Sequence, residues 1–296
     1  MKRDIYSTVT AQIIADLENG TAPWARPWKG GASPMTMPRN HVSGRVYSGV
    51  NILLLWSAMS KGDYAVNRWL TYKQATDLGG HVRKGERGTT IVYAGSFVPE
   101  AEKAKAAQTG KDAASVFFLK SMTVFNLAQC ENIGTFEAPF AANDERDRLE
   151  LADNLFAATG VKVQHGGDKA YYSPGSDFVQ MPHSAAFGDL LDYYRTLAHE
   201  LVHSTGHKSR LDRNILNKFG SVDYAREELV AEIGSAYVCA GIGIEYTTRH
   251  ADYVANWLTV LREDDRAIFK AASMASKAAQ WIEACAPVED VEELAA

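Results

Sequence analysis

A short HExxH motif in the second half of the chain has residues that could hold a metal ion and use it. It reads His199-Glu200-Leu201-Val202-His203. Residues four apart lie on one face of a helix, so His199 and His203 can both direct an imidazole toward one ion. Glu200 would then lie beside the ion, where its carboxylate could take a proton from activated water. This chemistry is typical of peptide-bond hydrolysis with Zn²⁺, although Mn²⁺ or another divalent ion could also enter such a site.

A catalytic zinc ion needs three protein ligands and an open position, so a third ligand must come from elsewhere. The extended motif HExxHxxGxxH would supply a third histidine at position 209, but that residue is Ser209. His207 is poorly placed because it follows the helix-breaking Gly206. We expect Glu228 to be the third ligand, and Glu232, on the same helical face, to orient an imidazole N–H.

Other interpretations of these residues stay open. Glu232 is the alternative third ligand. HExxH also occurs by chance on amphipathic helices, and glutamates on a helix are often solvated or ion-paired.

The elements that must position the motif follow from apolar spacing. Apolar residues from Leu190 to Val202 predict a long helix through HExxH. Before it we expect an amphipathic helix from Asn143 to about Thr159 and short strands at 161–163 and 177–181. The stretch 171–182 could place an edge strand beside the site, where a substrate backbone could pair.

The two halves of the chain differ in charge. Residues 1–140 contain 16 Lys and Arg against 11 Asp and Glu, a net charge of +5, whereas the remainder has a net charge of −10. Residues 21–96 alone have a net charge of +7. This concentration of positive charge indicates an anionic partner for the first half.

Aromatic residues alternate with these cations, a mixture that suits single-stranded DNA because unpaired bases offer flat faces to aromatic rings while Lys and Arg follow the phosphates. Trp56, inside an apolar run, is expected in the core, whereas Trp24 and Trp28, in a loop rich in Pro and Gly, are expected to be exposed. The turn at 82–88 either contacts phosphate or is merely solvated. The candidate nucleic-acid-binding residues are Trp24, Arg26, Trp28, Lys29, Arg39, Asn40, Arg45, Tyr47, Trp69, Lys73, Arg83, Lys84 and Arg87.

Amphipathic patterns in the first half predict helices at 4–17, 51–59 and 72–78 and paired strands at 89–98 and 116–126, with a solvated excursion at 100–114 between them. The fold class is α+β. We expect a basic α+β nucleic-acid-binding domain at 1–138, a mainly helical domain at 139–288 and an acidic tail at 289–296. Three distant cysteines exclude a disulfide framework and a cysteine-ligated zinc site. No apolar run is long enough to span a membrane, and a cytoplasmic location is expected.

Further motifs extend over nearly the whole chain. The first half contains Trp24, Pro27-Trp28, Gly44, Tyr47–Asn51, Trp69–Ala75, Gly79–Glu86 and Val124–Gln129, and the second half contains His199–His207 and Glu227–Glu232. In these motifs the chain resembles ArdC-type antirestriction proteins: its first half is similar to their N-terminal domain and its second half to their zincin-like domain.

The resemblance implies a plasmid-associated protein that binds single-stranded DNA and helps DNA that enters by conjugation to escape host restriction, with a host protein as the conceivable peptide substrate. The alternative is protection by occupancy of the DNA alone, with a catalytically silent structural zinc domain. A two-metal nuclease is disfavoured, because such sites use clusters of carboxylates for Mg²⁺.

Overall fold

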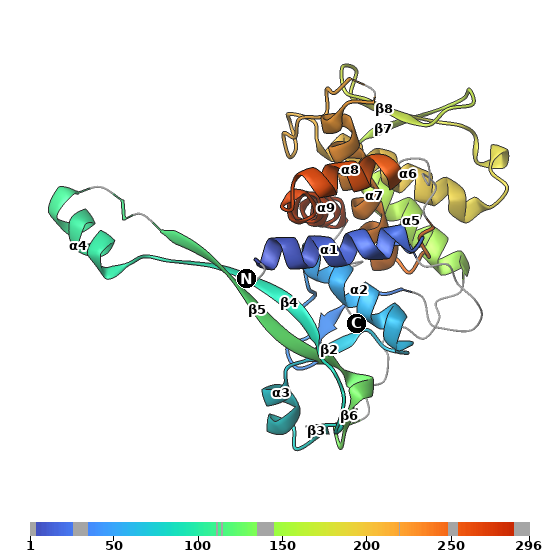
Figure 1. The fold of residues 1–296 in the computed structure, drawn as a ribbon. Helices are drawn as coiled ribbons and strands as arrows, with labels where there is room; N and C mark the ends of the chain where they lie inside the picture. Colours follow the sequence, from blue (N-terminus) through green and yellow to red (C-terminus); the bar gives the residue numbers. More distant parts are fainter. Residues whose placement is uncertain are drawn as a thin grey trace.

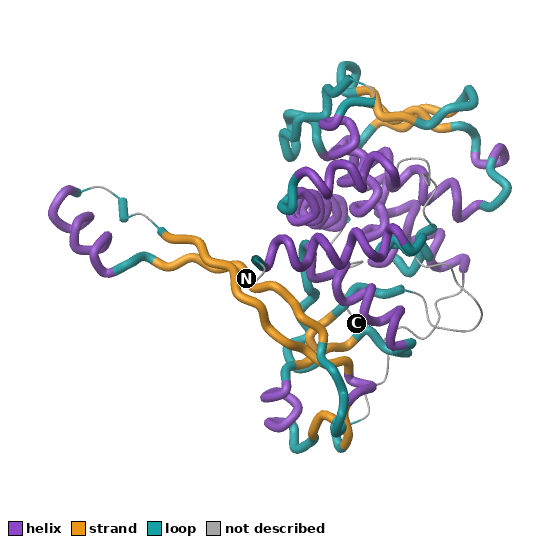
Figure 2. Tube along the Cα trace, in the orientation of Figure 1, coloured by secondary structure: helices purple, strands orange, loops and turns teal. Residues whose placement is uncertain are grey.

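The computed structural model describes residues 4–25, 35–110, 112–113, 115–134, 145–218, 220–247 and 254–286. The architecture is α+β, as expected. A helical body carries a small sheet at each end, and a long two-stranded ribbon leaves the body on one side (Figures 1 and 2). Cys130, Cys239 and Cys285 are free, and no described helix is both long and apolar enough to cross a membrane.

The first half combines short helices with a four-stranded sheet of order β1-β2-β5-β4. β1 and β2 are parallel, and the remaining pairs are antiparallel. The predicted helices and the strand pair are confirmed. The elements are α1 (Ile5–Glu18), β1 (Arg39–Asn40), α2 (Val50–Gly62), β2 (Arg68–Leu70), α3 (Tyr72–Asp77), β3 (His81–Val82), β4 (Thr89–Phe97), α4 (Glu100–Thr109), β5 (Val116–Asn126) and β6 (Cys130–Glu131).

The ribbon consists of β4 and β5, paired from Thr89 opposite Val124 to Phe97 opposite Val116. The excursion between the strands is solvated, as expected, and it contains the helix α4. This helix follows Pro99 and ends at Gly110, which has the positive φ that favours glycine after a helix. Figure 1 shows α4 at the tip of the ribbon, away from the helical body.

The second half places long helices against a three-stranded sheet of order β7-β9-β8, in which β7 and β9 are parallel. α6 packs on β8 and β9 and on the longer helix α7. The elements are α5 (Glu145–Ala158), β7 (Lys162–His165), β8 (Tyr171–Ser173), β9 (Phe178–Met181), α6 (Leu190–Thr205), α7 (Val222–Gly241), α8 (Val254–Glu263) and α9 (Ala267–Glu283).

Both halves contribute to the main hydrophobic core, because α1 packs on α8 and α2 packs on α9. Trp56 of α2 is 1% exposed and meets the ring of Tyr237 at a centroid distance of 5.4 Å, which confirms its expected place in the core. The backbone of Gly49, just before α2, donates to the Ser276 hydroxyl and accepts from the Tyr237 hydroxyl. The helices of the first half therefore rest directly on those of the second. The predicted boundary near residue 138 lies outside the described residues.

Candidate metal centre and nucleic-acid surface

The helix α6 presents the HExxH motif from a firmly packed position. Its first turn is capped by the side chain of Asp189, which accepts a hydrogen bond from the Leu191 amide. Ala198, Leu201 and Val202 are fully buried, so the helix cannot rotate about its axis without exposing its apolar face. The facing helix α7 begins at Ser221, whose side chain accepts from the Tyr224 amide.

Three predicted ligands meet between these helices. His199 Nε2 lies 3.1 Å from His203 Nε2, and the two Glu228 carboxylate oxygens each lie 3.5 Å from one of these nitrogens. The ligand atoms of the three side chains all fall within 4.8 Å of one another. Two imidazoles and one carboxylate are donors that suit Zn²⁺ or a similar divalent ion, and they leave a coordination position for water.

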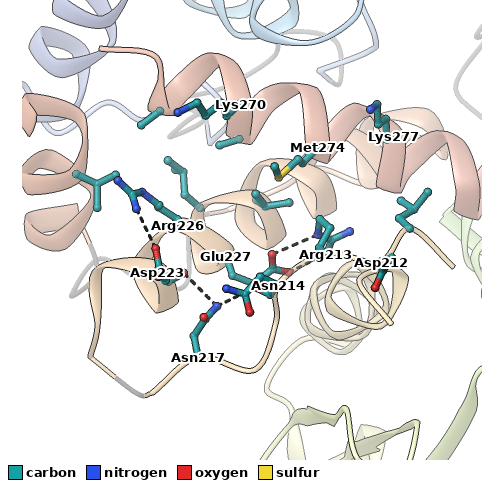
Figure 3. A pocket seen from close by; sticks show the side chains of 16 residues that line it. Asp212, Arg213, Asn214, Asn217, Asp223, Arg226, Glu227, Lys270, Met274 and Lys277 are labelled. Carbon is teal, nitrogen blue, oxygen red and sulfur yellow. Dashed lines mark hydrogen bonds and ion pairs between the residues drawn. The ribbon is translucent and has the colours of Figure 1, made fainter. Parts of the chain in front are cut away.

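His203 is held on its other side by a carboxylate and a guanidinium. Its Nδ1 lies 3.3 Å from Glu227 Oε1. Arg213 donates to both oxygens of Glu227, over 2.7 and 3.2 Å (Figure 3). It also donates to the Val202 carbonyl and the Thr205 hydroxyl. Glu227 and Arg213 were not among the functional residues predicted from the sequence. Adjacency to Glu228 was the only signal for Glu227, and no spacing rule pointed to Arg213.

Glu232 lies one helical turn beyond Glu228 and faces the side of the His199 ring opposite Glu228. Its Oε2 is 3.6 Å from His199 Nδ1, and the residue is fully buried. The carboxylate is thus on the Nδ1 side of the imidazole, where the predicted orienting group should be, and it is separate from the cluster that Glu228 joins.

The charges in the centre are strongly coupled. Burial lowers the pKa of His203, but hydrogen bonds with Glu227 and Glu228 outweigh it and raise the pKa to about 10. Burial opposes ionisation of Glu228, yet the two histidines hold its pKa far below the usual range. Glu200 is 8% exposed, and its charge contributes to the raised pKa of both His199 and His203. The predicted general base therefore lies close to both imidazoles.

His207 belongs to a different set of contacts. Its Nδ1 lies 2.7 Å from the Ser209 hydroxyl and 3.7 Å from Asp177 Oδ2. The chain turns so tightly at Gly206 that an added Cβ would lie 2.4 Å from Ile215 Cγ2. Within the described chain, the predicted edge strand exists as β8, at one edge of the sheet on which α6 packs.

A cavity of about 460 Å³ lies behind the metal centre, between the loop after α6 and the helices α7 and α9 (Figure 3). Its wall contains Glu227 and Arg213, together with the apolar Leu229, Ala271 and Met274. The three clustered ligands and Glu200 do not line it. The cavity therefore adjoins the groups that orient His203, and it is not an approach to the clustered ligand atoms.

Two of the predicted base-stacking tryptophans are core residues, which is a correction to the sequence analysis. Trp24 is 0% exposed and packs edge-on against Trp257 of α8, with ring centroids 5.7 Å apart. Trp69 is also 0% exposed, and its indole N–H donates to Asn67 Oδ1 over 2.6 Å. The sequence around Trp24 predicts an exposed loop because Trp257, which covers the ring, lies far away in the sequence. Neither ring can stack on a base in this fold.

Other predicted nucleic-acid residues have visible structural partners. Asn40 caps a turn, since its Oδ1 accepts from the amides of Val42 and Ser43. Its Nδ2 donates to Gln74, and Tyr47 beside it is half-buried. Two exposed cations are in local ion pairs, Lys73 with Asp77 and Arg83 with Glu86.

Positive charge nevertheless gathers on this half of the molecule. Arg45, Lys84 and Arg87 are exposed. Arg39 lies directly opposite Arg68 on the parallel strands β1 and β2. Burial and then the charge of Arg39 lower the pKa of Arg68. Arg26, Trp28 and Lys29 lie outside the described residues.

Two family models match separate parts of the chain. A family model described as the N-terminal domain of anti-restriction factor ArdC matches residues 3–125, and one described as a zincin-like metallopeptidase matches residues 150–274. The uncharacterized protein y4eC of Sinorhizobium fredii is 42% identical over 284 residues, which cover 95% of this chain and 92% of that protein. A DNA primase TraC of Escherichia coli is 37% identical over 95% of this chain, but the match spans only 27% of the primase.

Two solved structures are similar to this chain over nearly its whole length. The Mn(II)-bound crystal structure of the antirestriction ArdC protein from plasmid R388 matches with a TM-score of 0.79 and 39% identity, covering 97% of this chain and 99% of that one. Its metal-free form matches with a TM-score of 0.77 and 40% identity, covering 96% and 98%. These matches and the clustered His-His-Glu donors indicate a divalent metal site. The chain belongs to the ArdC family of antirestriction proteins.

Proposed function

We propose that this protein binds single-stranded DNA, protects DNA entering by conjugation from host restriction, and carries a zinc-dependent metallopeptidase site in its second half. Membership of the ArdC family supports the antirestriction role. The convergence of His199, His203 and Glu228 carries the metallopeptidase assignment. Restriction acts on DNA inside the cell, so the proposal places the protein in the cytoplasm.

The side chains around the cluster have the roles that hydrolysis needs. A divalent ion at this site would supply Lewis-acid activation of water. His199, His203 and Glu228 would hold the ion, and Glu200 would accept a proton from the attacking water. Glu227 and Glu232 face the Nδ1 atoms of the two imidazoles, which favours the tautomer with Nε2 free to bind the ion. The edge strand β8 is where we expect the backbone of a peptide substrate, such as a host protein, to pair.

Glu200→Gln separates catalysis from metal binding. The amide keeps the shape of the side chain but cannot accept the proton, so the variant should retain its metal and lose hydrolysis and protection during conjugation. Metal content, cleavage of host proteins and survival of incoming DNA are the three measurements. Glu150→Gln, an exposed position on α5, is the matched control. Unchanged cleavage by Glu200→Gln would exclude this mechanism.

A second candidate function is protection by occupancy alone, with a silent metal domain. The low exposure of the centre favours it, since the side chains of His199, His203 and Glu228 are only 7%, 14% and 9% exposed. Full protection by Glu200→Gln, with metal retained, would support this second function and make proteolysis dispensable.

The DNA-binding part of the proposal rests on the +7 charge of residues 21–96 and on the exposed cations that contribute to it. Binding to an unpaired oligonucleotide should weaken steeply with salt, because each phosphate contact releases a counterion. Replacing Arg45, Lys84 and Arg87 together by alanine should reduce the slope of log K against log salt by about 2, at about 0.7 per lost contact on a single strand. A flat salt response of the unmodified protein would contradict single-strand binding.

A further inference from the structure

The β4–β5 ribbon has one face on which aromatic side chains gather in the open. Directly opposed residues of an antiparallel pair point to the same side of the ribbon. Tyr93 lies opposite Lys120, Gly95 opposite Phe118 and Phe97 opposite Val116, so these six residues share one face. We name this face, with its rings Tyr93, Phe118 and Phe97, the aromatic face. In Figure 1 the ribbon extends away from the helical body, toward α4.

The three rings form an evenly spaced row. The ring centroid of Phe118 lies 6.1 Å from that of Tyr93 and 6.1 Å from that of Phe97. The Phe118 ring lies over Gly95, where an added Cβ would meet its Cζ at 2.6 Å. The glycine thus leaves room for the ring to lie across the ribbon instead of standing away from it. The result is a low platform in which Phe118 is partly buried and its two neighbours are exposed.

Two of the three rings are unusually exposed for aromatic side chains. Tyr93 and Phe97 are each 53% exposed. Contiguous exposed apolar groups on a soluble protein mark a binding surface more often than single exposed side chains do. The ribbon therefore has the geometry of a site whose partner offers flat, apolar faces.

The charges on the ribbon identify the class of partner. β4 and β5 contain one charged residue, Lys120, and no Asp or Glu. Lys120 Nζ lies 4.8 Å from the centroid of the Phe118 ring, so a cation borders the platform. The exposed cations Lys84 and Arg87 lie just before β4, at the root of the ribbon. A row of rings beside cations and without carboxylates complements a polyanion that carries planar bases.

We propose that the aromatic face of the β4–β5 ribbon stacks on the bases of single-stranded DNA. Tyr93, Phe118 and Phe97 take up successive or nearby bases, and Lys120 contacts the phosphates beside them. Duplex DNA is a poor ligand, because its base faces are hidden in the stack. This inference rests on the proposed single-strand binding. Because Trp24 and Trp69 are buried and cannot stack on bases, the stacking surface had no assigned residues, and the aromatic face now supplies them.

The test compares two faces of the same ribbon. Tyr93→Leu combined with Phe118→Leu keeps apolar bulk but removes two rings from the aromatic face. Phe117→Leu is the matched control, because Phe117 lies opposite Ser96 on the other face and is 81% exposed. Affinities are measured with a fluorescent oligothymidine and with an abasic oligonucleotide of the same length, which retains the phosphates but lacks the bases.

The full chain should bind oligothymidine more tightly than the abasic strand, since stacking adds to phosphate contacts. The double variant should lose about tenfold or more of its affinity for oligothymidine and little for the abasic strand. Phe118→Tyr keeps an aromatic ring at this position, so its affinity should equal that of the unmodified protein. The affinity of Phe117→Leu should also be unchanged.

Two results would overturn the assignment while leaving single-strand binding intact. One is a double variant that still prefers oligothymidine to the abasic strand. The other is an equal loss in Phe117→Leu, which would mean that the ribbon acts without regard to its face. Failure of the unmodified protein to bind either strand would instead reject the proposed DNA binding itself.

Discussion

His203 Nδ1 lies 3.3 Å from Glu227 Oε1, so the imidazole is held from behind by a carboxylate that is itself bound by a guanidinium. The ion pair between Arg213 and Glu227 is nearly buried, with side-chain exposures of 6% and 9%. A charged acceptor fixed in this way sets the direction of the Nδ1–H bond and thereby the direction of Nε2. The orientation of the His203 ring is therefore fixed by residues outside the HExxH motif.

The first prediction concerns this carboxylate. Glu227→Gln should weaken divalent metal binding by about 10- to 100-fold, because the amide is a poorer acceptor for the imidazole N–H and leaves Arg213 without its ionic partner. Competition with a chromogenic chelator measures the affinity, with Glu150→Gln as the control. An affinity equal to that of the unmodified chain would show that Glu227 does not orient His203.

Removal of the metal should leave the fold in place. Buried apolar residues of α6 and α7 join these helices independently of the proposed metal ligands. Chelation should therefore preserve the far-ultraviolet circular dichroism spectrum and lower the thermal midpoint. At a free metal concentration of 100 Kd, the ion should contribute about 2.7 kcal/mol to the free energy of unfolding. Loss of helical signal on chelation would instead identify a metal that is required for folding, as in zinc fingers.

Trp24→Ala should destabilise the protein by about 3–5 kcal/mol, because a fully buried indole that packs on Trp257 would leave a cavity. Urea unfolding followed by circular dichroism measures the change. Tyr72→Ala is the control, since this ring is 60% exposed and its loss should cost little. If Trp24→Ala keeps full stability and loses DNA affinity, the original expectation of an exposed stacking residue is correct.

A half-buried glutamate should make stability depend on pH. Burial raises the pKa of Glu283 to about 7, against an ordinary value of 4.5, although the nearby Arg39 opposes the shift. The folded chain therefore keeps a proton that the unfolded chain has released. The resulting stabilisation is complete below pH 4.5, declines as the pH rises and is lost above pH 7.

Glu283→Gln should remove this dependence, because the amide does not ionise. The difference in unfolding free energy between the unmodified chain and the variant should change by on the order of 1–3 kcal/mol between pH 5 and pH 8. Thermal unfolding at both pH values, with Glu150→Gln alongside, measures it. A difference that does not vary with pH would mean that the Glu283 pKa is not raised.

Local patterns predicted the helices and most strands because each depends on neighbours in sequence. The apolar spacing around HExxH defines α6, and the same reasoning places Glu228 on a helical face that can meet it. Ser209 excluded the three-histidine arrangement and left Glu228 or Glu232 as the expected third donor, and in the structure Glu228 lies with the two histidines.

Contacts between distant segments could not be predicted in this way. Trp24 is covered by Trp257, and the residues near Trp24 in the sequence do not indicate that contact. Arg213 reaches Glu227 from a loop whose path depends on the tight turn at Gly206. The aromatic face was missed for a different reason. Strand alternation indicates which residues share a side, but it does not reveal whether that side is exposed or covered by another element.

The backbone of Gly49 is bound by Ser276 of α9 and Tyr237 of α7, and the core beneath it is built by helices from both halves. Unfolding one half would expose apolar surface of the other, so the chain should lose its structure in a single cooperative step. Ligands that bind at separate places then add to the same free energy of unfolding. An oligonucleotide held by the ribbon and an ion held between α6 and α7 each raise the cost of opening the same core, and each protects the whole chain from proteases that cut only unfolded protein.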